Sequence, residues 1–392
     1  MFKTIKRLGI CLVLITAPLA AAGAGEELSQ LWLNGKRGYI NAKGEVVIEP
    51  EFDSIWGFTS NGLSVAKINN KFGYINTKGK WVIEPQFNIV SLFADNGLAE
   101  VTQNHKWGYI NEKGKWVIQP QFDSAEDFAA NGLAVVEQNH KWGYINEKGK
   151  WVIKPQFSYA KDFAANGLAA VEQNDKWGYI NEKGEWVIRP RFDSSGQFAD
   201  NGLAAIKQKD KYGFINTKGE WVIRPQFDKI GGFDDNGLAM VEQNNKWGII
   251  NTKGEWAIEP QFDDVKWHLD NELIGATQGD KWGYINRKGE WVIKPQFSYV
   301  SDFAANGLAA TEQKDKWGYV NTKGEWVIKL QFDYAWSFDA NDIAPVKLND
   351  KLRYINAKGE TVVYVDTTAC LEEVLKNAKG EIVYPKNYVC PE

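Results

Sequence analysis

The side chains in this sequence that are best suited to binding are its tryptophans. The 392 residues include 18 of them, and flat indole rings stack well on sugars and other apolar ligands. Fourteen occupy two positions of an internal repeat, as Trp107 and Trp116 do, and we interpret these as core residues. The other four are Trp32, Trp56, Trp267 and Trp336.

Three of these four tryptophans occur in the linkers between repeat units. Trp56, Trp267 and Trp336 each follow the phenylalanine that ends a repeat motif, where other units carry small or polar residues. His268 lies beside Trp267 in the most irregular unit, in which Glu272 replaces a loop glycine. An irregularity in a uniform array marks either a contact site or local drift. We therefore take Trp56, Trp267, His268 and Trp336 as the candidate binding residues, with drift or packing on a sheet edge as the alternative.

The sequence lacks the patterns of catalytic and metal sites. It contains no H-E-x-x-H, phosphate loop, G-x-S-x-G or calcium loop. His105 and His140 share a turn position in adjacent units, but two exposed turn histidines make a weak metal site. Carboxylates recur in every unit, whereas catalysis needs one singular pocket. The nearest approach to a unique set is Asp263, Asp264, Asp270 and Glu272. We expect no enzyme activity, no metal and no cofactor.

The first 24 residues have the features of a signal peptide. A basic start at residues 3–7 precedes an apolar run at 8–19, and Ala20 to Ala22 form a cleavage pattern, with cleavage after Ala22 or Ala24. The apolar run is too short for a mature membrane anchor, and no second one follows. We expect the mature chain to begin near residue 25, to lie in the periplasm or outside the cell, and to have no membrane span.

Export would place two cysteines, Cys370 and Cys390, in an oxidising compartment. A bridge between them closes a ring of 21 residues, which contributes roughly 3 kcal/mol by the loop-entropy estimate. We predict this disulfide in a C-terminal cap at residues 365–392, with two free thiols as the alternative.

A repeat of 35 residues organises the rest of the chain. A glycine recurs without a single insertion, and a tenth copy carries Arg353 in its place. The glycines are Gly38, Gly73, Gly108, Gly143, Gly178, Gly213, Gly248, Gly283 and Gly318. A fixed period of this length indicates supersecondary units that bury their apolar surfaces against one another. We therefore predict one array of ten units at residues 25–364, the first and last of them degenerate.

Turn residues divide each unit into three strands, as in the unit that opens at Leu168. Asn174 and Asp175 form a two-residue hairpin loop, and Gly184 supplies the left-handed position of the next turn. Pro190 is expected to end the third strand, because it lacks an N–H for the ladder. The strands are predicted at residues 168–173, 176–181 and 185–189.

Both faces of this predicted antiparallel meander are apolar. One face carries Trp177, Tyr179 and Val187, and the other carries Ile180, Trp186 and Ile188. A half-exposed sheet alternates apolar with polar residues instead. Each meander must therefore pack face to face between its neighbours, about 10 Å from each.

Two all-β architectures satisfy this requirement: an open superhelical array and a closed β-propeller. Ten units exceed the usual four to eight blades. The end units are less aromatic, because Arg37 and Val46 replace the two tryptophans in the first unit, and Leu352 and Thr361 replace them in the last. Degenerate ends suit two exposed termini. These features favour the open array, and the closed propeller is the alternative.

The repeat motif is long and specific. Residues 176–193 read Lys-Trp-Gly-Tyr-Ile-Asn-x-Lys-Gly-x-Trp-Val-Ile-x-Pro-x-Phe-Asp. This motif resembles that of the bacterial WG-repeat (KWG-repeat) proteins, and the resemblance extends from about residue 28 to residue 363. It implies a β-rich repeat module, commonly exported or attached to other domains and generally read as an interaction scaffold. It implies no catalytic residues.

We therefore expect an exported, non-enzymatic scaffold that binds a protein partner in the cell envelope or outside the cell, through linkers and strand edges. Binding of a cell-wall or surface glycan through the linker tryptophans is the alternative, and a passive spacer is a third possibility. Acidic residues outnumber basic ones 50 to 46, for a net charge of −4, which argues against a nucleic-acid partner.

Overall fold

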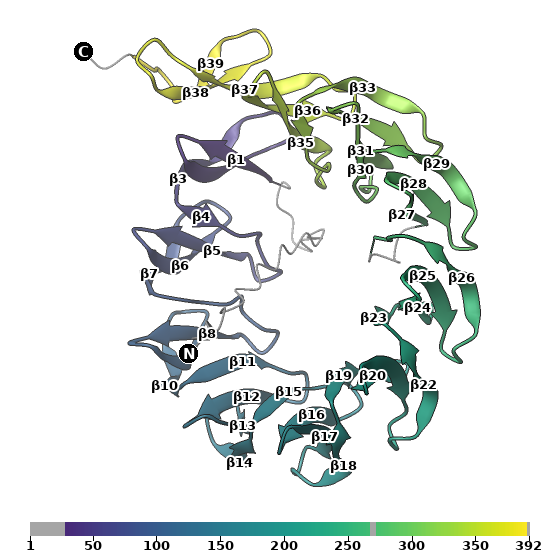
Figure 1. The fold of residues 1–392 in the computed structure, drawn as a ribbon. Helices are drawn as coiled ribbons and strands as arrows, with labels where there is room; N and C mark the ends of the chain where they lie inside the picture. Colours follow the sequence, from purple (N-terminus) through teal and green to yellow (C-terminus); the bar gives the residue numbers. More distant parts are fainter. Residues whose placement is uncertain (1–27, 267–271, 390–392) are drawn as a thin grey trace, which may run out of the picture.

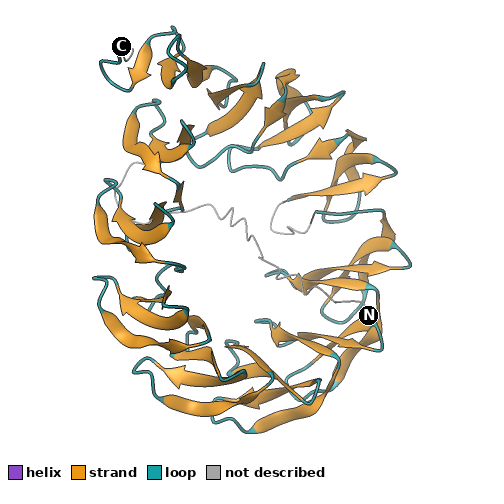
Figure 2. Cartoon of the chain, turned by 60° about the vertical axis from the view of Figure 1, so that its left-hand side comes forward, coloured by secondary structure: helices purple, strands orange, loops and turns teal. Residues whose placement is uncertain are grey.

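The computed structural model describes residues 28–266 and 272–389. Within these residues the regular structure consists of strands, which form ten small antiparallel sheets arranged in a ring around a central opening (Figures 1 and 2). We call the sheets blades 1 to 10 in chain order. The described part of the chain includes no helix that is long and apolar enough to cross a bilayer.

The first five blades occupy residues 29–192. Blade 1 contains β1 (Ser29–Leu33), β2 (Lys36–Ile40) and β3 (Val46–Phe52). Blade 2 contains β4 (Ser54–Ile55), β5 (Leu63–Ile68), β6 (Lys71–Asn76) and β7 (Trp81–Phe87). Blade 3 contains β8 (Leu98–Gln103), β9 (Lys106–Asn111) and β10 (Trp116–Phe122). Blade 4 contains β11 (Ser124–Phe128), β12 (Leu133–Gln138), β13 (Lys141–Asn146) and β14 (Trp151–Phe157). Blade 5 contains β15 (Tyr159–Phe163), β16 (Leu168–Gln173), β17 (Lys176–Asn181) and β18 (Trp186–Phe192).

The other five blades complete the ring. Blade 6 contains β19 (Ser194–Phe198), β20 (Ala204–Gln208), β21 (Lys211–Ile215) and β22 (Trp221–Phe227). Blade 7 contains β23 (Lys229–Phe233), β24 (Leu238–Gln243), β25 (Lys246–Asn251) and β26 (Trp256–Phe262). Blade 8 contains β27 (Leu273–Gln278), β28 (Lys281–Asn286) and β29 (Trp291–Phe297). Blade 9 contains β30 (Tyr299–Val300), β31 (Leu308–Gln313), β32 (Lys316–Asn321) and β33 (Trp326–Phe332). Blade 10 contains β34 (Tyr334–Ala335), β35 (Ile343–Leu348), β36 (Lys351–Asn356), β37 (Thr361–Thr367), β38 (Glu373–Asn377) and β39 (Ile382–Tyr384).

The predicted hairpin turns are present in blade 5. β16 and β17 pair in continuous register from Leu168 opposite Asn181 to Gln173 opposite Lys176. The turn between them places Asn174 at φ 54° and Asp175 at φ 59°, the left-handed conformation that these residue types tolerate. Local turn chemistry therefore sets the register of the first two strands of a repeat.

The third strand of each unit is longer than the sequence predicted. β18 does not end at Pro190 but continues to Phe192, with Tyr179 opposite Ile188 and irregular pairing on either side. Beside it, a Cβ on Gly178 would lie 2.5 Å from the Ile188 carbonyl oxygen and 2.7 Å from the Pro190 nitrogen. The proline is tolerated because the ladder is interrupted there by a bulge, so no N–H is required.

The bulge also changes which side chains are buried. Val187, predicted to share a face with Tyr179, is 45% exposed. Ile188 takes the buried place opposite Tyr179 instead. A shift of one residue moves a side chain to the other face of a strand, and this accounts for the wrong assignment of both residues.

The linkers contribute a fourth strand that the sequence analysis did not predict. β15 follows the third strand of one unit but pairs with β16 of the next, with Ala160 opposite Val171. In blades 3 and 8 the linker pairs through an isolated bridge, at Val90 and Val265. These inner strands lie next to the central opening, whereas strands such as β14 and β22 lie on the outer rim (Figure 1).

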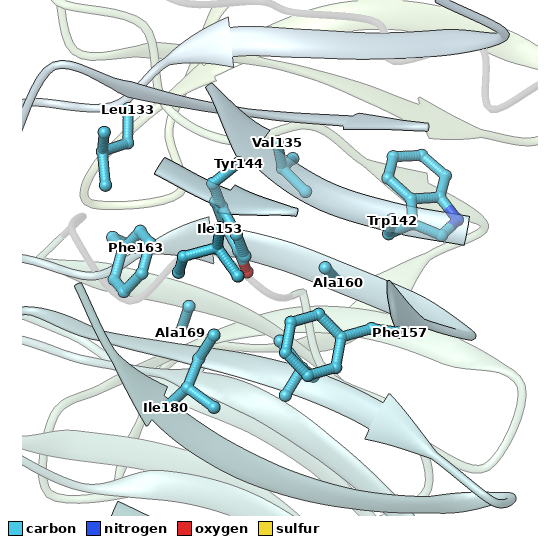
Figure 3. Close-up of a cluster of buried hydrophobic side chains, with 11 residues drawn as sticks. Leu133, Val135, Trp142, Tyr144, Ile153, Phe157, Ala160, Phe163, Ala169 and Ile180 are labelled. Atoms are coloured by element: carbon cyan, nitrogen blue, oxygen red, sulfur yellow. The ribbon is translucent and has the colours of Figure 1, made fainter. Parts of the chain in front are cut away.

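The core of the molecule lies between successive blades, as the two apolar faces predict. Tyr144, Ile153 and Phe157 of blade 4 pack against Ala169 and Ile180 of blade 5 (Figure 3). Half-buried Trp186 meets Phe157 edge-on, with ring centroids 5.9 Å apart. The same contact recurs around the ring at 5.4 to 5.9 Å, so the second tryptophan of the motif is a packing residue between blades.

The ring closes between blades 10 and 1. Leu31 and Leu33 of β1 share a buried cluster with Tyr354 and Leu375. The Trp32 backbone N–H donates to the Tyr354 hydroxyl at 2.9 Å, and its ring stacks on that tyrosine at 6.3 Å. Of the two architectures considered, the closed propeller is therefore the one that forms, and the open array that the degenerate ends favoured does not. The less aromatic end units contact each other instead of solvent, with Val46 and Leu352 packed at the junction.

Candidate functional site

Two neighbouring residues in or directly after the inner strand lie at the wall of the central opening. In β11, Ala125 and Phe128 are buried in the interface between blades, and the exposed Glu126 and Asp127 lie between them. The pairing of β11 with β12 is irregular at this point, which leaves both side chains on the open edge of the blade. We call the described residues at these two positions of the linkers the inner wall; residue 267 lies outside the described residues.

The first of these two positions varies from unit to unit in size and charge. Its residues are Trp56, Ser91, Glu126, Lys161, Gly196, Gly231, Lys266, Ser301 and Trp336. The flanking framework stays nearly constant, because most units share the same tyrosine, tryptophan and phenylalanine positions. The ring therefore holds a variable set of side chains on a repeated frame.

Two of the sequence-predicted binding residues belong to the inner wall. Trp56 and Trp336 are 38% and 39% exposed. Their backbone N–H groups donate to Val65 O at 2.9 Å and Pro345 O at 3.1 Å, so both residues pair with the next strand of their blades. They lie in blades 2 and 10, on either side of blade 1.

The other predicted residues are only partly described. Trp267, His268 and Cys390 lie outside the described residues. Cys370 lies in the segment between β37 and β38. The Cys370–Cys390 disulfide therefore stays a prediction, as does a binding role for residues 267 and 268.

A tyrosine from the preceding blade holds most stretches of the inner wall; Phe214 and Ile249 stand at the tyrosine position in blades 6 and 7. The hydroxyl of Tyr39 donates to Trp56 O at 2.6 Å, and that of Tyr319 donates to Trp336 O at 2.7 Å. Burial raises the pKa of Tyr39 to about 12, which keeps its hydroxyl protonated as a donor at neutral pH. The repeated tyrosine is thus an anchor for the backbone that carries the variable side chains.

Four aromatic side chains form a row in blades 9 and 10, and the row ends at Trp336 of the inner wall. Tyr299 and Trp317 have ring centroids 5.4 Å apart, Trp317 and Tyr334 4.8 Å, and Tyr334 and Trp336 4.5 Å. The two tyrosines and Trp336 are exposed, and Trp317 lies buried between the tyrosines. The sequence analysis missed this row, although Tyr299 and Tyr334 stand where Ser194 stands in blade 6.

Charge is distributed unevenly around the inner wall. Glu126 and Asp127 of blade 4 lie near Asp162 of blade 5. Burial, and then the charges of Glu126 and Asp127, raise the pKa of Asp162 to about 7. Partial desolvation by its neighbours, and then the charge of Asp127, also raise the pKa of Glu126, although its side chain is exposed. This part of the wall is therefore acidic, and the carboxyl group of Asp162 is partly protonated near neutral pH.

The described residues include no group of three or more His, Cys, Asp or Glu side chains arranged to hold a metal ion. His105 and His140 sit in hairpin turns at φ 61° and 59°, and both are exposed. The chemistry that the geometry offers is recognition by aromatic rings and charges on a rigid wall.

The chain was compared with solved structures, and one of them superposes on its fold. A crystal structure of a eukaryotic initiation factor superposes with a TM-score of 0.52 and 10% identity, covering 87% of this chain and 96% of that one. Hsv2p of Kluyveromyces lactis aligns with a TM-score of 0.35 and 9% identity, covering 74% and 96%. No curated protein matches the chain significantly. At such identities the likeness concerns the fold alone.

The family assignment comes from the repeat itself. The family model described as WG containing repeat matches nine consecutive stretches of the chain: 38–72, 72–107, 107–142, 142–177, 177–212, 212–247, 247–282, 282–317 and 317–351. These stretches cover most of the sequence and run from the first blade into the last. The chain therefore belongs to the family of proteins built from the WG containing repeat.

Proposed function

We propose that this protein is an exported, non-enzymatic scaffold that binds a protein partner in the cell envelope or outside the cell. The observation that carries the proposal is the inner wall, where side chains that differ in size and charge between units line the central opening on a repeated backbone. A recognition surface needs varied side chains, whereas a passive spacer has no use for them. Repeat arrays present such surfaces over a long path, which suits a large partner.

Packing between blades and hydrogen bonds to the linker backbone order the inner wall before a partner binds. Blades pack face to face through buried side chains, and tyrosine hydroxyls anchor the linker backbone, as Tyr144 does at Lys161 O, 2.6 Å away. A surface that is ordered before binding loses less conformational entropy when a partner docks. The rigid ring therefore favours specific association over loose adhesion.

The test compares partner capture by the mature chain, residues 25–392, with capture by a variant of the inner wall. The variant carries Trp56→Ser, Glu126→Ser, Lys161→Ser, Lys266→Ser and Trp336→Ser. Serine already occupies this position at Ser91 and Ser301, so we expect the variant to fold. The matched control is Asp175→Asn, since Asn245 occupies the same hairpin position in blade 7.

Both proteins are immobilised and exposed to a solubilised envelope fraction, and the captured protein is then purified and its binding measured with the isolated components. We expect stoichiometric capture by the wild type and by Asp175→Asn, and a loss of at least tenfold in affinity for the inner-wall variant. Equal affinity of all three forms would contradict the proposal.

A second candidate function is binding of a cell-wall glycan, and the aromatic row of Tyr299, Trp317, Tyr334 and Trp336 favours it. Sugar rings stack on exposed aromatic side chains, and a row of them suits a polymer. The test is retention on purified peptidoglycan, together with quenching of tryptophan fluorescence by its soluble fragments. Replacing Tyr299, Tyr334 and Trp336 by serine should abolish both signals, whereas Tyr159→Ser in blade 5 should not.

A further inference from the structure

Glu100 is a carboxylate at a position that the other units fill differently. It lies in β8 of blade 3 and is only 7% exposed. The equivalent residues are Gln30, Val65, Val135, Ala170, Ala205, Met240, Gly275, Ala310 and Pro345. None of them is charged, and all but Gln30 are small or apolar. A charge that is buried at one point of a repeated frame requires a specific reason.

The buried carboxylate has few donors among the described residues: hydrogen bonds from the Ser91 side chain and from its own backbone N–H act to lower its pKa but do not offset its burial. Glu100 Oε2 has no hydrogen-bond partner there, and its near neighbour is the carboxylate of Asp127, which is also an acceptor. Burial, and then the contact with Asp127, raise the pKa of Glu100 well above its ordinary value. Two acceptors that face each other need a proton or an external cation between them.

The neighbouring donors are already used. The hydroxyls of Tyr74, Tyr109 and Tyr144 donate to the backbone oxygens of Ser91, Glu126 and Lys161, at 2.7, 2.7 and 2.6 Å. The Lys161 ammonium donates to Ser195 O at 2.8 Å and lies 5.3 Å from the centre of the Trp177 ring. Ser91 Oγ donates weakly to Asp127 Oδ1 at 3.4 Å. The interior therefore supplies no positive charge to Glu100.

Further acidic side chains lie near Glu100 along the central opening. Glu126 and Asp127 lie on β11 and Asp162 on β15, and these strands lie on the inner side of adjacent blades (Figure 1). We call Glu100, Glu126, Asp127 and Asp162 the acidic wall. Because no three acidic groups of the described residues are arranged to hold a metal ion, the spread of charge over three blades suits an extended chain with several cationic groups.

We propose that the acidic wall binds a lysine- or arginine-rich segment of the protein partner, with one cationic side chain reaching the pair formed by Glu100 and Asp127. This inference rests on the proposed function, and it names the chemistry of the partner. An ammonium or guanidinium group carries the positive charge that the buried pair lacks and an N–H donor for Glu100 Oε2, which has no partner. Carboxylates of the neighbouring inner strands meet the next cationic residues of the segment.

The test uses a labelled peptide of alternating lysine and serine, and a second peptide of alternating glutamate and serine. Binding to the mature protein is measured by fluorescence anisotropy at low and at high salt. We expect the lysine peptide to bind and the glutamate peptide not to bind, with affinity falling as salt screens the charges. Glu100→Val and Asp127→Asn should each weaken binding by at least about tenfold, as the loss of a charged hydrogen bond implies.

The control variants separate charge from folding. Val65 and Val135 occupy the position of Glu100 in blades 2 and 4, so Glu100→Val should fold, which its melting curve verifies. Asp175→Asn also removes one negative charge, but from a hairpin turn, and should bind the lysine peptide like the wild type. Wild-type affinity of Glu100→Val and Asp127→Asn, or equal binding of the two peptides, would overturn the inference.

Failure of this inference differs from failure of the proposed function. If the envelope partner is lost from the inner-wall variant but binds Glu100→Val as tightly as the wild type, the scaffold stands and the acidic wall is not its docking site. If the lysine peptide binds with the expected pattern while all forms of the ring capture the same proteins equally, the cationic site stands and the proposed function is wrong.

Discussion

Single side chains in this ring either hold adjacent blades together or form part of the wall of the central opening. Tyr179 and Phe192 are buried between blades, and their hydrophobic area holds adjacent sheets together. Glu100 has the opposite character, because it leaves a carboxylate oxygen without a donor inside the same kind of interface. A residue that costs stability and occurs at one position of ten is consistent with a binding role.

Because burial of the Glu100 carboxylate is unfavourable, we expect its replacement to stabilise the folded protein. Glu100→Val removes a buried carboxylate with one oxygen that has no partner, a defect of about 1–3 kcal/mol. It supplies a side chain that blades 2 and 4 already accommodate. We expect the thermal midpoint at neutral pH to rise by about 1–4 °C, as measured by calorimetry. A lower midpoint would mean that the carboxylate stabilises the fold and that its pairing has been misread.

The acidic wall also predicts a pH dependence. The pKa of Asp162 is about 7 in the folded chain, against an ordinary value of 3.8, and that of Glu100 is raised as well. A carboxyl whose pKa rises on folding binds its proton more tightly in the folded state, so its contribution to stability is lost as pH rises through the folded pKa. We expect the thermal midpoint to increase as pH falls from about 8 to about 5.

The matched variant for this experiment is Glu100→Val combined with Asp162→Gln, since Gln197 occupies the position of Asp162 in blade 6. It should show a smaller slope over the same interval. Below about pH 4 the trend reverses, because the ion pair with Lys106 lowers the pKa of Asp123, and the stability from that pair is lost on protonation. A midpoint that falls steadily from pH 8 to 5 would contradict this account.

At the scale of the element, the bulge in the third strand shapes every typical blade. Gly178 leaves room for the backbone of Ile188 and Pro190 to approach closely. The bulge turns Val187 outward and lets the strand continue to Phe192, whose ring meets Trp221 of the next blade at 5.8 Å. The glycine that marks the repeat is therefore required by the close backbone contact in the blades that have this bulge.

A methyl group at this glycine should therefore be costly. Gly178→Ala would place Cβ 2.5 Å from a backbone oxygen, and overpacking of this kind costs about 1–3 kcal/mol. The matched control is Gly232→Ala, where an added Cβ meets nothing within 4 Å. Urea unfolding should show the loss for Gly178→Ala and little change for Gly232→Ala. Equal stability of both variants would show that the bulge yields easily.

At the scale of the whole molecule, the C-terminal hairpin helps to close the ring. β38 and β39 extend the sheet of blade 10 (Figure 1), and the Glu373 N–H donates to Asn34 Oδ1 of the first blade at 3.0 Å. Leu375 is fully buried in the cluster that contains Leu31 and Leu33. Closure removes the two exposed ends that an open array would have to cover.

A substitution at Leu375 therefore tests whether the junction between blades 10 and 1 holds the ring closed. Leu375→Ala should cost about 2–5 kcal/mol of stability, and small-angle scattering should detect opening of the ring as a larger radius of gyration. Val389→Ala is the control, since Val389 is exposed near the chain end. An unchanged radius and melting curve for Leu375→Ala would show that the junction between blades 10 and 1 does not hold the ring.

The sequence by itself determined what depends on neighbours along the chain. Turn residues such as Asn174 and Asp175, and the period of 35, are local signals, so the repeat, its hairpins and the face-to-face packing of blades were predictable. The exposed tryptophans Trp56 and Trp336 were also found this way, because they interrupt a regular pattern. Family membership follows from the same local motif.

The tertiary structure alone decided what depends on the angle and contacts between units. Closure of the ring requires the small rotations from blade to blade to add up until Leu31 meets Leu375, and no local signal encodes that sum. The side on which Val187 and Ile188 lie depends on a bulge forced by a close backbone contact across strands. The acidic wall likewise exists only because neighbouring blades bring Glu100 against Asp127, 27 residues further along the chain.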